Sequence, residues 1–137
     1  MNLSKKEREE LRMMFGGKCA YCGCELGRGW CADHIEPVYR ETKFIRETWD
    51  SPRKLVKTGA VLWPERDTKE NLFPCCRSCN IHKGPYALET WRSNLSDLIG
   101  VLQRGYPTYR HAVRFGQVIE TPKQVVFYFE KKAQENS

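Results

Sequence analysis

Two pairs of cysteines share the spacing Cys-x-x-Cys: Cys19 with Cys22, and Cys76 with Cys79. Thiolates at this spacing bind zinc tetrahedrally, because one tight turn can present two sulfurs to the same ion. The long separation between the pairs means that one ion would join two distant parts of a small chain and stabilise it. We therefore predict a structural Zn²⁺ site made of these four residues.

Three further cysteines, Cys24, Cys31 and Cys75, leave other arrangements open. Cys75 and Cys24 are the alternative ligands; with Cys75 the second pair would have a wider gap, which zinc also accepts. Ordinary buried thiols without a metal are a third arrangement. Because the cysteine count is odd and the N-terminus lacks the apolar segment of an export signal, we expect reduced thiols rather than disulfides. The three further cysteines are then expected to be buried.

Polar residues that could do chemistry lie between and just after these pairs. Residues 33–37 read Asp-His-Ile-Glu-Pro, residues 71–74 read Asn-Leu-Phe-Pro, and residues 80–84 read Asn-Ile-His-Lys-Gly. An Asp-His dipeptide alone is weak evidence, because histidine is often a hydrogen-bonded core residue rather than a catalyst. Its position between the two halves of a zinc site gives this dipeptide more weight.

Together with Cys-Ala-Tyr-Cys-Gly at 19–23 and Cys-Arg-Ser-Cys-Asn at 76–80, these segments resemble the cysteine-containing HNH endonucleases, including stand-alone members encoded by phages. The resemblance covers about residues 5–85. It implies a ββα-metal (His-Me finger) motif on a zinc-ribbon base, and a metal-dependent DNA endonuclease that hydrolyses phosphodiester bonds. By analogy alone, it also implies work beside phage DNA-packaging proteins.

The resemblance implies roles for four residues. His34 would be the general base that removes a proton from the attacking water, a task that suits a neutral imidazole near pH 7. Asp33 and Asn80 would hold a divalent ion through oxygen, and this ion would neutralise phosphate charge and help the 3′-oxygen to leave. Asn71 would brace the loop beneath the histidine through hydrogen bonds to the backbone.

The chain departs from the family pattern in two places. Many members carry histidine where this chain has Asn80, and an amide oxygen favours Mg²⁺ or Mn²⁺ over a softer metal. His82 is an alternate ligand. The segment between His34 and Asn71 is also longer than the compact loop that is usual in the family, and its role stays open.

The formal net charge of +6 and a pI near 9.0 suit a polyanionic partner, for which the resemblance implies DNA. By position in the motif, Arg77 and Lys83 are the first candidates for phosphate contact. Taken singly, each is more often a solvated surface charge, but a basic connection beside the site favours contact as a group. The further candidates are Arg40, Lys43, Arg46, Arg53, Lys54 and Lys57. Since no base-reading module is present, we expect low sequence specificity.

The elements that must position these residues can be read from local patterns. A capping box at 4–7 and apolar residues at helical spacing predict a helix over 5–15, which two glycines end. We expect a short strand at 30–36, and an extended piece at 72–75 that leads into a helix from Asn80 onward. Residues 39–70 lack strong periodicity and should form a long connection, within which 59–64 could be a short strand or a packed loop.

Beyond the motif, the spacing of leucines and Trp91 predicts one helix over about 87–104, closed by a glycine and a proline. Two β-prone runs, 117–120 and 124–130, flank Thr-Pro-Lys and predict a terminal β-hairpin. Trp91 and the aromatic residues at 127–129 are expected to belong to the core. The tail, 133–137, should be frayed.

These elements predict an α+β fold in a single domain, 1–137, with a motif core at about 5–85, an extension of helix and hairpin at 86–132, and the tail. No membrane segment is recognisable, so we expect a soluble protein in the cytoplasm of a bacterium or a phage-infected cell. A non-catalytic zinc-ribbon module that binds nucleic acid or protein, and a ribonuclease with the same site, remain alternatives. Nicking versus double-strand cleavage, and the oligomeric state, stay open.

Overall fold

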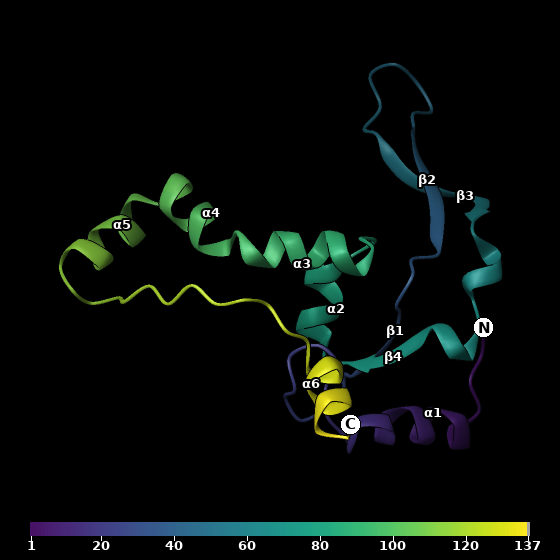
Figure 1. Ribbon diagram of the computed structural model, residues 1–137. Coiled ribbons are helices and arrows are strands. Elements are labelled where there is room, and N and C mark those ends of the chain that lie inside the picture. Colours follow the sequence, from purple (N-terminus) through teal and green to yellow (C-terminus); the bar gives the residue numbers. More distant parts are fainter. Residues whose placement is uncertain (137) are drawn as a thin grey trace.

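The computed structural model describes residues 1–136 and has a mixed α+β fold with two small two-stranded sheets (Figure 1). The first sheet pairs β1 (Cys31–His34) with β4 (Leu72–Cys75) in antiparallel register. β1 is shorter than the predicted strand at 30–36, whereas β4 agrees with the predicted extended piece. Because this sheet brings the Asp-His dipeptide beside the second cysteine pair, it positions both halves of the site.

Helices lie before and after this sheet. The N-terminal helix α1 (Lys5–Arg12) has the predicted capping box and continues as the short 3₁₀ helix η1 (Met13–Phe15). Gly16 ends it in the left-handed conformation, at φ +65°, as the glycine pair predicts. Helix α2 (Arg77–Lys83) begins three residues earlier than predicted, because the Cys76 sulfur caps it by accepting a hydrogen bond from the Cys79 amide.

The long connection contains a sheet that its weak periodicity did not predict. Strands β2 (Tyr39–Ile45) and β3 (Lys54–Leu62) pair antiparallel and project from the rest of the molecule (Figure 1). The alternation that usually marks a strand is missing, since no residue of either strand is buried and neither face needs to be apolar. The short helices η2 (Pro64–Arg66) and η3 (Lys69–Asn71) then lead back to β4.

The single helix predicted over 87–104 is wrong, because the chain forms two helices, α3 (Leu88–Ser96) and α4 (Leu98–Gly105), separated at Asp97. The Ser96 hydroxyl donates to the carbonyl of Arg92, and short polar side chains of this kind compete with helical backbone bonds. The chain does not leave helical structure at Pro107. This residue is the first of another helix, α5 (Pro107–Arg114), at a position where the missing N–H of proline costs little.

The predicted terminal hairpin is also wrong. Residues 117–127 follow an irregular path, and the chain ends in helix α6 (Tyr128–Glu135), so that residues 133–135 of the predicted frayed tail are helical. The backbone carbonyl of Val125 accepts a hydrogen bond from Arg92 instead of from a neighbouring strand. Glu130 caps α6 by accepting from the Phe127 amide. Ser137, the last residue of the predicted tail, lies outside the described residues.

Aromatic side chains form the centre of the core. Trp91 and Phe127 stack with ring centroids 5.2 Å apart, and Tyr21 meets the Trp91 ring edge-on at 5.1 Å. All three are almost fully buried, so the prediction that Trp91 and Phe127 are core residues is confirmed. Within residues 1–136, no helix is both long and apolar enough to cross a membrane.

Candidate functional site

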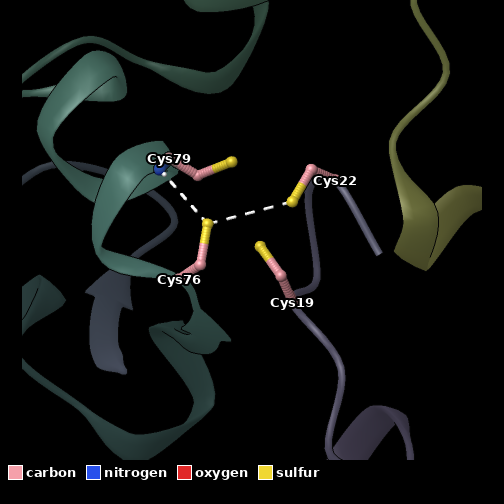
Figure 2. A group of neighbouring side chains, drawn as sticks. All are labelled: Cys19, Cys22, Cys76 and Cys79. Atoms are coloured by element: carbon pink, nitrogen blue, oxygen red, sulfur yellow. Dashed lines mark hydrogen bonds between the residues drawn. The ribbon is translucent and has the colours of Figure 1, made fainter. Parts of the chain in front are cut away.

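Four cysteine sulfurs meet where the first turn faces the start of α2 (Figure 2). Cys19 and Cys22 come from the turn after α1, while Cys76 and Cys79 come from the end of β4 and the first turn of α2. The sulfur atoms all lie within 4.8 Å of one another, and Cys22 Sγ is 3.8 Å from Cys76 Sγ. The predicted grouping of these four residues is therefore confirmed.

The geometry of the four-cysteine group fits zinc. A Zn–S bond of about 2.3 Å in a tetrahedron places sulfurs about 3.8 Å apart, which is the separation between Cys22 and Cys76. Backbone amides also point at the sulfurs: Tyr21 N–H donates to Cys19, and Cys79 N–H donates to Cys76. These four thiolates would hold the ion and so join the first turn to α2.

The turn that carries the first pair depends on Gly23. Its φ is +80°, and an added Cβ would lie 2.8 Å from the Tyr128 ring of α6. A larger residue is therefore excluded by both backbone conformation and space. Helix α6 closes over this turn, since the amides of Tyr128 and Phe129 donate to the carbonyls of Tyr21 and Ala20.

Hydrogen bonding decides which sulfur of the group carries negative charge. The bond from Cys79, helped by backbone amides, lowers the pKa of Cys19 to about 4. The same bond, together with burial, raises the pKa of Cys79. The lowered pKa of Cys19 favours its thiolate, which is the form of cysteine that binds a metal.

The other three cysteines lie outside the group. Cys75 is fully buried on β4, as predicted, and burial raises the pKa of its thiol. Cys24 is exposed and Cys31 is half-buried, so the expectation that both are buried is wrong. Cys24 follows the Gly23 turn at the surface, where the core cannot cover it.

Asp33 is held inside the protein by a cation. Its Oδ2 accepts a hydrogen bond from the Tyr21 hydroxyl at 2.5 Å and lies 3.1 Å from Lys83 Nζ. Burial and the Asp33 carboxylate raise the pKa of Tyr21, so this hydroxyl stays protonated as a donor. Lys83 also donates to the backbone carbonyl of His34 at 2.9 Å. The Asp33 carboxylate is therefore paired with a buried cation, which reduces its attraction for a divalent ion.

His34 leaves β1 toward the opposite side and lines a pocket of about 410 Å³. Its Nε2 is 2.8 Å from Oδ1 of Asp67, and the imidazole is 29 % exposed. Arg8 and Arg40 line the same pocket. Hydrogen bonds from the N-terminal ammonium and from His34 lower the pKa of Asp67, so it is a carboxylate at neutral pH. The pocket is thus lined by an imidazole, the carboxylate that contacts it and two arginines, of which Arg8 donates to the Trp30 carbonyl at 3.2 Å.

Asn71 joins the segments on either side of this pocket. Its side-chain oxygen accepts from the Glu36 amide at 2.9 Å, and its amide nitrogen donates to the carbonyls of Glu36 and Arg66, both at 2.8 Å. The backbone carbonyl of Asn71 accepts from Ile35. This is the backbone-bracing geometry that the resemblance implies for Asn71.

The two remaining candidate metal ligands lie on α2. The Asn80 side chain is half-buried and has no hydrogen-bond partner among residues 1–136, whereas its backbone carbonyl accepts from Gly84. His82 is exposed, and its Nδ1 accepts a hydrogen bond from the Trp91 indole at 2.8 Å. The bond to Trp91 makes His82 a structural partner of the core and leaves only its Nε2 for other contacts.

The basic candidates for phosphate contact fall into three groups. Arg77 is exposed at the start of α2. Lys83 is only 1 % exposed and is engaged with Asp33, so it does not present its charge to a DNA backbone. The remaining candidates are exposed, on the projecting sheet or in the loop at its tip: Arg40, Lys43, Arg46, Arg53, Lys54 and Lys57.

Sequence reasoning missed Arg8, Tyr21 and Asp67. Asp67 reaches His34 only because η2 and η3 fold the connection back onto β1, and nothing in its local sequence marks it. Arg8 lies on the exposed face of α1 and reads as an ordinary surface charge. Tyr21 lies inside the first Cys-x-x-Cys pair. A turn does not require an aromatic residue there, so its presence was a signal that this side chain has another role.

Comparison with family models, with curated proteins and with solved structures returned no match for this chain. The geometry of the four-cysteine group and of the His34 pocket therefore carries the functional argument alone.

Proposed function

We propose that the protein is a DNA endonuclease of the HNH type, in which a zinc-bound frame positions His34 as the general base. The observation that carries this proposal is the 2.8 Å contact between His34 and the Asp67 carboxylate, in a pocket that two arginines also line. The succession of β1, β4 and α2 around the four cysteines supports a ββα-metal motif on a zinc-ribbon base.

The His34–Asp67 contact specifies how proton transfer would work. When the neutral ring donates its Nε2–H to Asp67, its Nδ1 lone pair is left to accept a proton from water. The water oxygen then attacks the scissile phosphorus, the bond between phosphorus and the 3′-oxygen breaks, and the 3′-oxygen takes a proton from solvent. Asp67 holds the ring in this tautomer and stabilises the imidazolium that forms. Arg8 and Arg40 would neutralise phosphate oxygens in the pocket.

The divalent ion implied by the resemblance does not fit Asp33 as the structure has it. Lys83 and the Tyr21 hydroxyl already occupy Oδ2 of that carboxylate. The proposed proton transfer therefore uses only side chains of the pocket, and Asp33 and Asn80 as ligands of Mg²⁺ or Mn²⁺ rest on the resemblance alone. A requirement for Mg²⁺ or Mn²⁺ can be tested by adding each ion to dialysed, zinc-loaded protein and measuring cleavage. A chelator is unsuitable for this test because it would also remove the zinc.

The decisive experiment is cleavage of supercoiled plasmid by His34→Ala, with His111→Ala as the matched control. His111 is an exposed histidine on α5 and does not line the His34 pocket. Loss of a general base costs about 10²- to 10⁴-fold in rate, so His34→Ala should be nearly inactive with unchanged zinc content, while His111→Ala cleaves normally. Cleavage by His34→Ala at the wild-type rate would remove His34 from the mechanism.

One observation favours a non-catalytic zinc-ribbon module as the second candidate. Asp33 is neutralised by Lys83, which suits a structural role for both residues. A module predicts binding of nucleic acid without cleavage under any of the metal conditions. The same assay with structured RNA in place of plasmid distinguishes a ribonuclease.

A further inference from the structure

The projecting pair of strands, residues 39–63, contributes only Arg40, at its base, to the proposed catalytic site. We name it the β2–β3 arm. None of its strand residues is buried, and the arm stands away from the rest of the molecule (Figure 1). An isolated two-stranded sheet is only marginally stable in water. Maintaining one with both faces exposed is therefore most easily explained by a bound partner.

The charge of the β2–β3 arm identifies a polyanion as that partner. Six basic and three acidic side chains give the arm half of the net charge of +6. Two of the three acids are engaged within the arm, since Glu41 accepts from Thr58 and Asp50 accepts from Thr48. The basic side chains have no comparable set of carboxylate partners: Lys54 lies 3.6 Å from Glu47, in an exposed and weak pair.

The register distributes this charge over both faces of the arm. Lys57 lies opposite Thr42, and on the other face Lys43 lies opposite Val56 and Lys54 opposite Ile45. A flat anionic surface would engage one face only. A groove of B-DNA is about 12 Å wide on its major side, admits a two-stranded ribbon, and has a phosphate backbone along each wall. Lysines on both faces of the ribbon match that arrangement.

The tip of the arm presents a tryptophan from an ordered turn. Trp49 is 88 % exposed. The turn is closed by the Ser51 amide, which donates to the Thr48 carbonyl at 3.1 Å, and by Arg46, which donates to the Trp49 carbonyl at 2.7 Å. Because the backbone is already held in place, little further ordering is needed when the indole meets a base.

We propose that the β2–β3 arm enters the major groove of duplex DNA, with its lysines on the phosphates and the Trp49 indole against the exposed base edges and thymine methyl groups. This inference rests on the proposed function for its choice of DNA. It assigns a substrate-holding role to the part of the arm beyond Arg40, in addition to the role of the His34 pocket. A second copy of this chain is the other possible occupant of the exposed apolar pair Phe44 and Leu55, and the test below distinguishes it.

The test measures binding of a short labelled DNA duplex to the full-length, zinc-loaded protein without added divalent ions. Trp49→Ala should weaken binding by roughly 5-fold or more, because the apolar contact of the indole with the base edges is lost. Trp49→Phe should restore most of the affinity. Phe115→Ala is the matched control, because Phe115 is a 79 % exposed aromatic residue outside the arm, and it should bind like wild type.

Salt dependence tests the lysines separately from the tryptophan. Changing Lys43 and Lys54 to Gln together should reduce the slope of log affinity against log salt by about 2, since each phosphate contact contributes about 0.9. DNA should also quench tryptophan emission more in the wild type than in Trp49→Phe. Zinc content and far-UV circular dichroism equal to wild type would show that each variant is folded.

Two results would overturn the arm proposal. One is equal DNA affinity for Trp49→Ala and Phe115→Ala. The other is a change of oligomeric state in Trp49→Ala at unchanged DNA affinity, which would make the arm a self-association surface. Cleavage by the wild-type protein separates this proposal from the nuclease proposal. If the wild type binds duplex DNA through Trp49 and the arm lysines but does not cleave plasmid under any metal condition, only the nuclease proposal is refuted.

Discussion

Lys83 and Asp33 form a buried ion pair whose removal should be costly in a predictable way. Only 1 % of the Lys83 side chain and 9 % of the Asp33 side chain are exposed, so water screens this pair weakly. Lys83→Met keeps most of the apolar stem but removes the ammonium that lies 3.1 Å from Asp33 and donates to the His34 carbonyl. Asp33 then remains as an unpaired buried charge.

Breaking one side of such a pair costs about 3 to 5 kcal/mol, so Lys83→Met should lower the free energy of unfolding by about that amount. Asp33→Asn should cost a similar amount, because it leaves the Lys83 ammonium unpaired. The double variant contains neither buried charge. Its cost should therefore be smaller than the sum of the two single costs by about 2 kcal/mol or more.

Urea unfolding at a fixed excess of zinc measures all four proteins of this cycle. The same excess of zinc is needed throughout, because metal binding itself contributes to the unfolding free energy. Additive costs would refute the argument, since they would mean that the two charges do not depend on each other. A cost below about 1 kcal/mol for Lys83→Met would show that water reaches this pair.

Three further predictions concern the four-cysteine group, Asn71 and Glu130. Metal analysis should find one tightly held zinc per chain. Cys76→Ser should lose far more zinc and stability than Cys75→Ser, because the Cys75 sulfur is outside the four-cysteine group. Equal losses in the two variants would contradict the assignment of the ligands. Asn71→Ala removes three hydrogen bonds to backbone and should cost about 2 to 3 kcal/mol of stability in urea unfolding and lower any cleavage activity; unchanged stability would show that the loop is braced otherwise. The hydrogen bond from Arg92 lowers the pKa of Glu130 below its ordinary value of 4.5. The ionised Glu130 therefore contributes fully to stability at neutral pH, and this contribution is lost as the pH falls below 4.5. Glu130→Gln should weaken the loss of unfolding free energy at acid pH, and an unchanged loss in this variant would contradict the prediction.

Local patterns predicted the elements whose cause is local. The capping box and glycines that bound α1 depend on neighbouring residues, as does the short extended piece at 72–75, and both predicted elements are present in the structure. The β-prone run at 124–130 does not form the predicted strand, because the packing of Phe127 against Trp91 and the cap from Glu130 outweigh β propensity. The sequence pattern did not predict the break between α3 and α4 at Asp97, because the leucine spacing continues across that residue.

The β2–β3 arm is a different kind of failure. Secondary-structure prediction from patterning depends on burial, and an element with two exposed faces leaves no periodic signal. Its strands are recognisable only from their cross-strand hydrogen bonds, which the register of pairs such as Phe44 with Leu55 records.

The sequence by itself determined the four-cysteine group, because a Cys-x-x-Cys turn sets the separation of its two sulfurs within a few bonds. It also indicated His34 as the candidate general base. Only the tertiary structure decided what surrounds the Asp-His dipeptide. Asp33 pairs with Lys83 because α2 packs against β1, and His34 meets Asp67 because the connection folds back. The charge state and orientation of a side chain depend on such distant partners, and their choice is made by packing rather than by spacing along the chain.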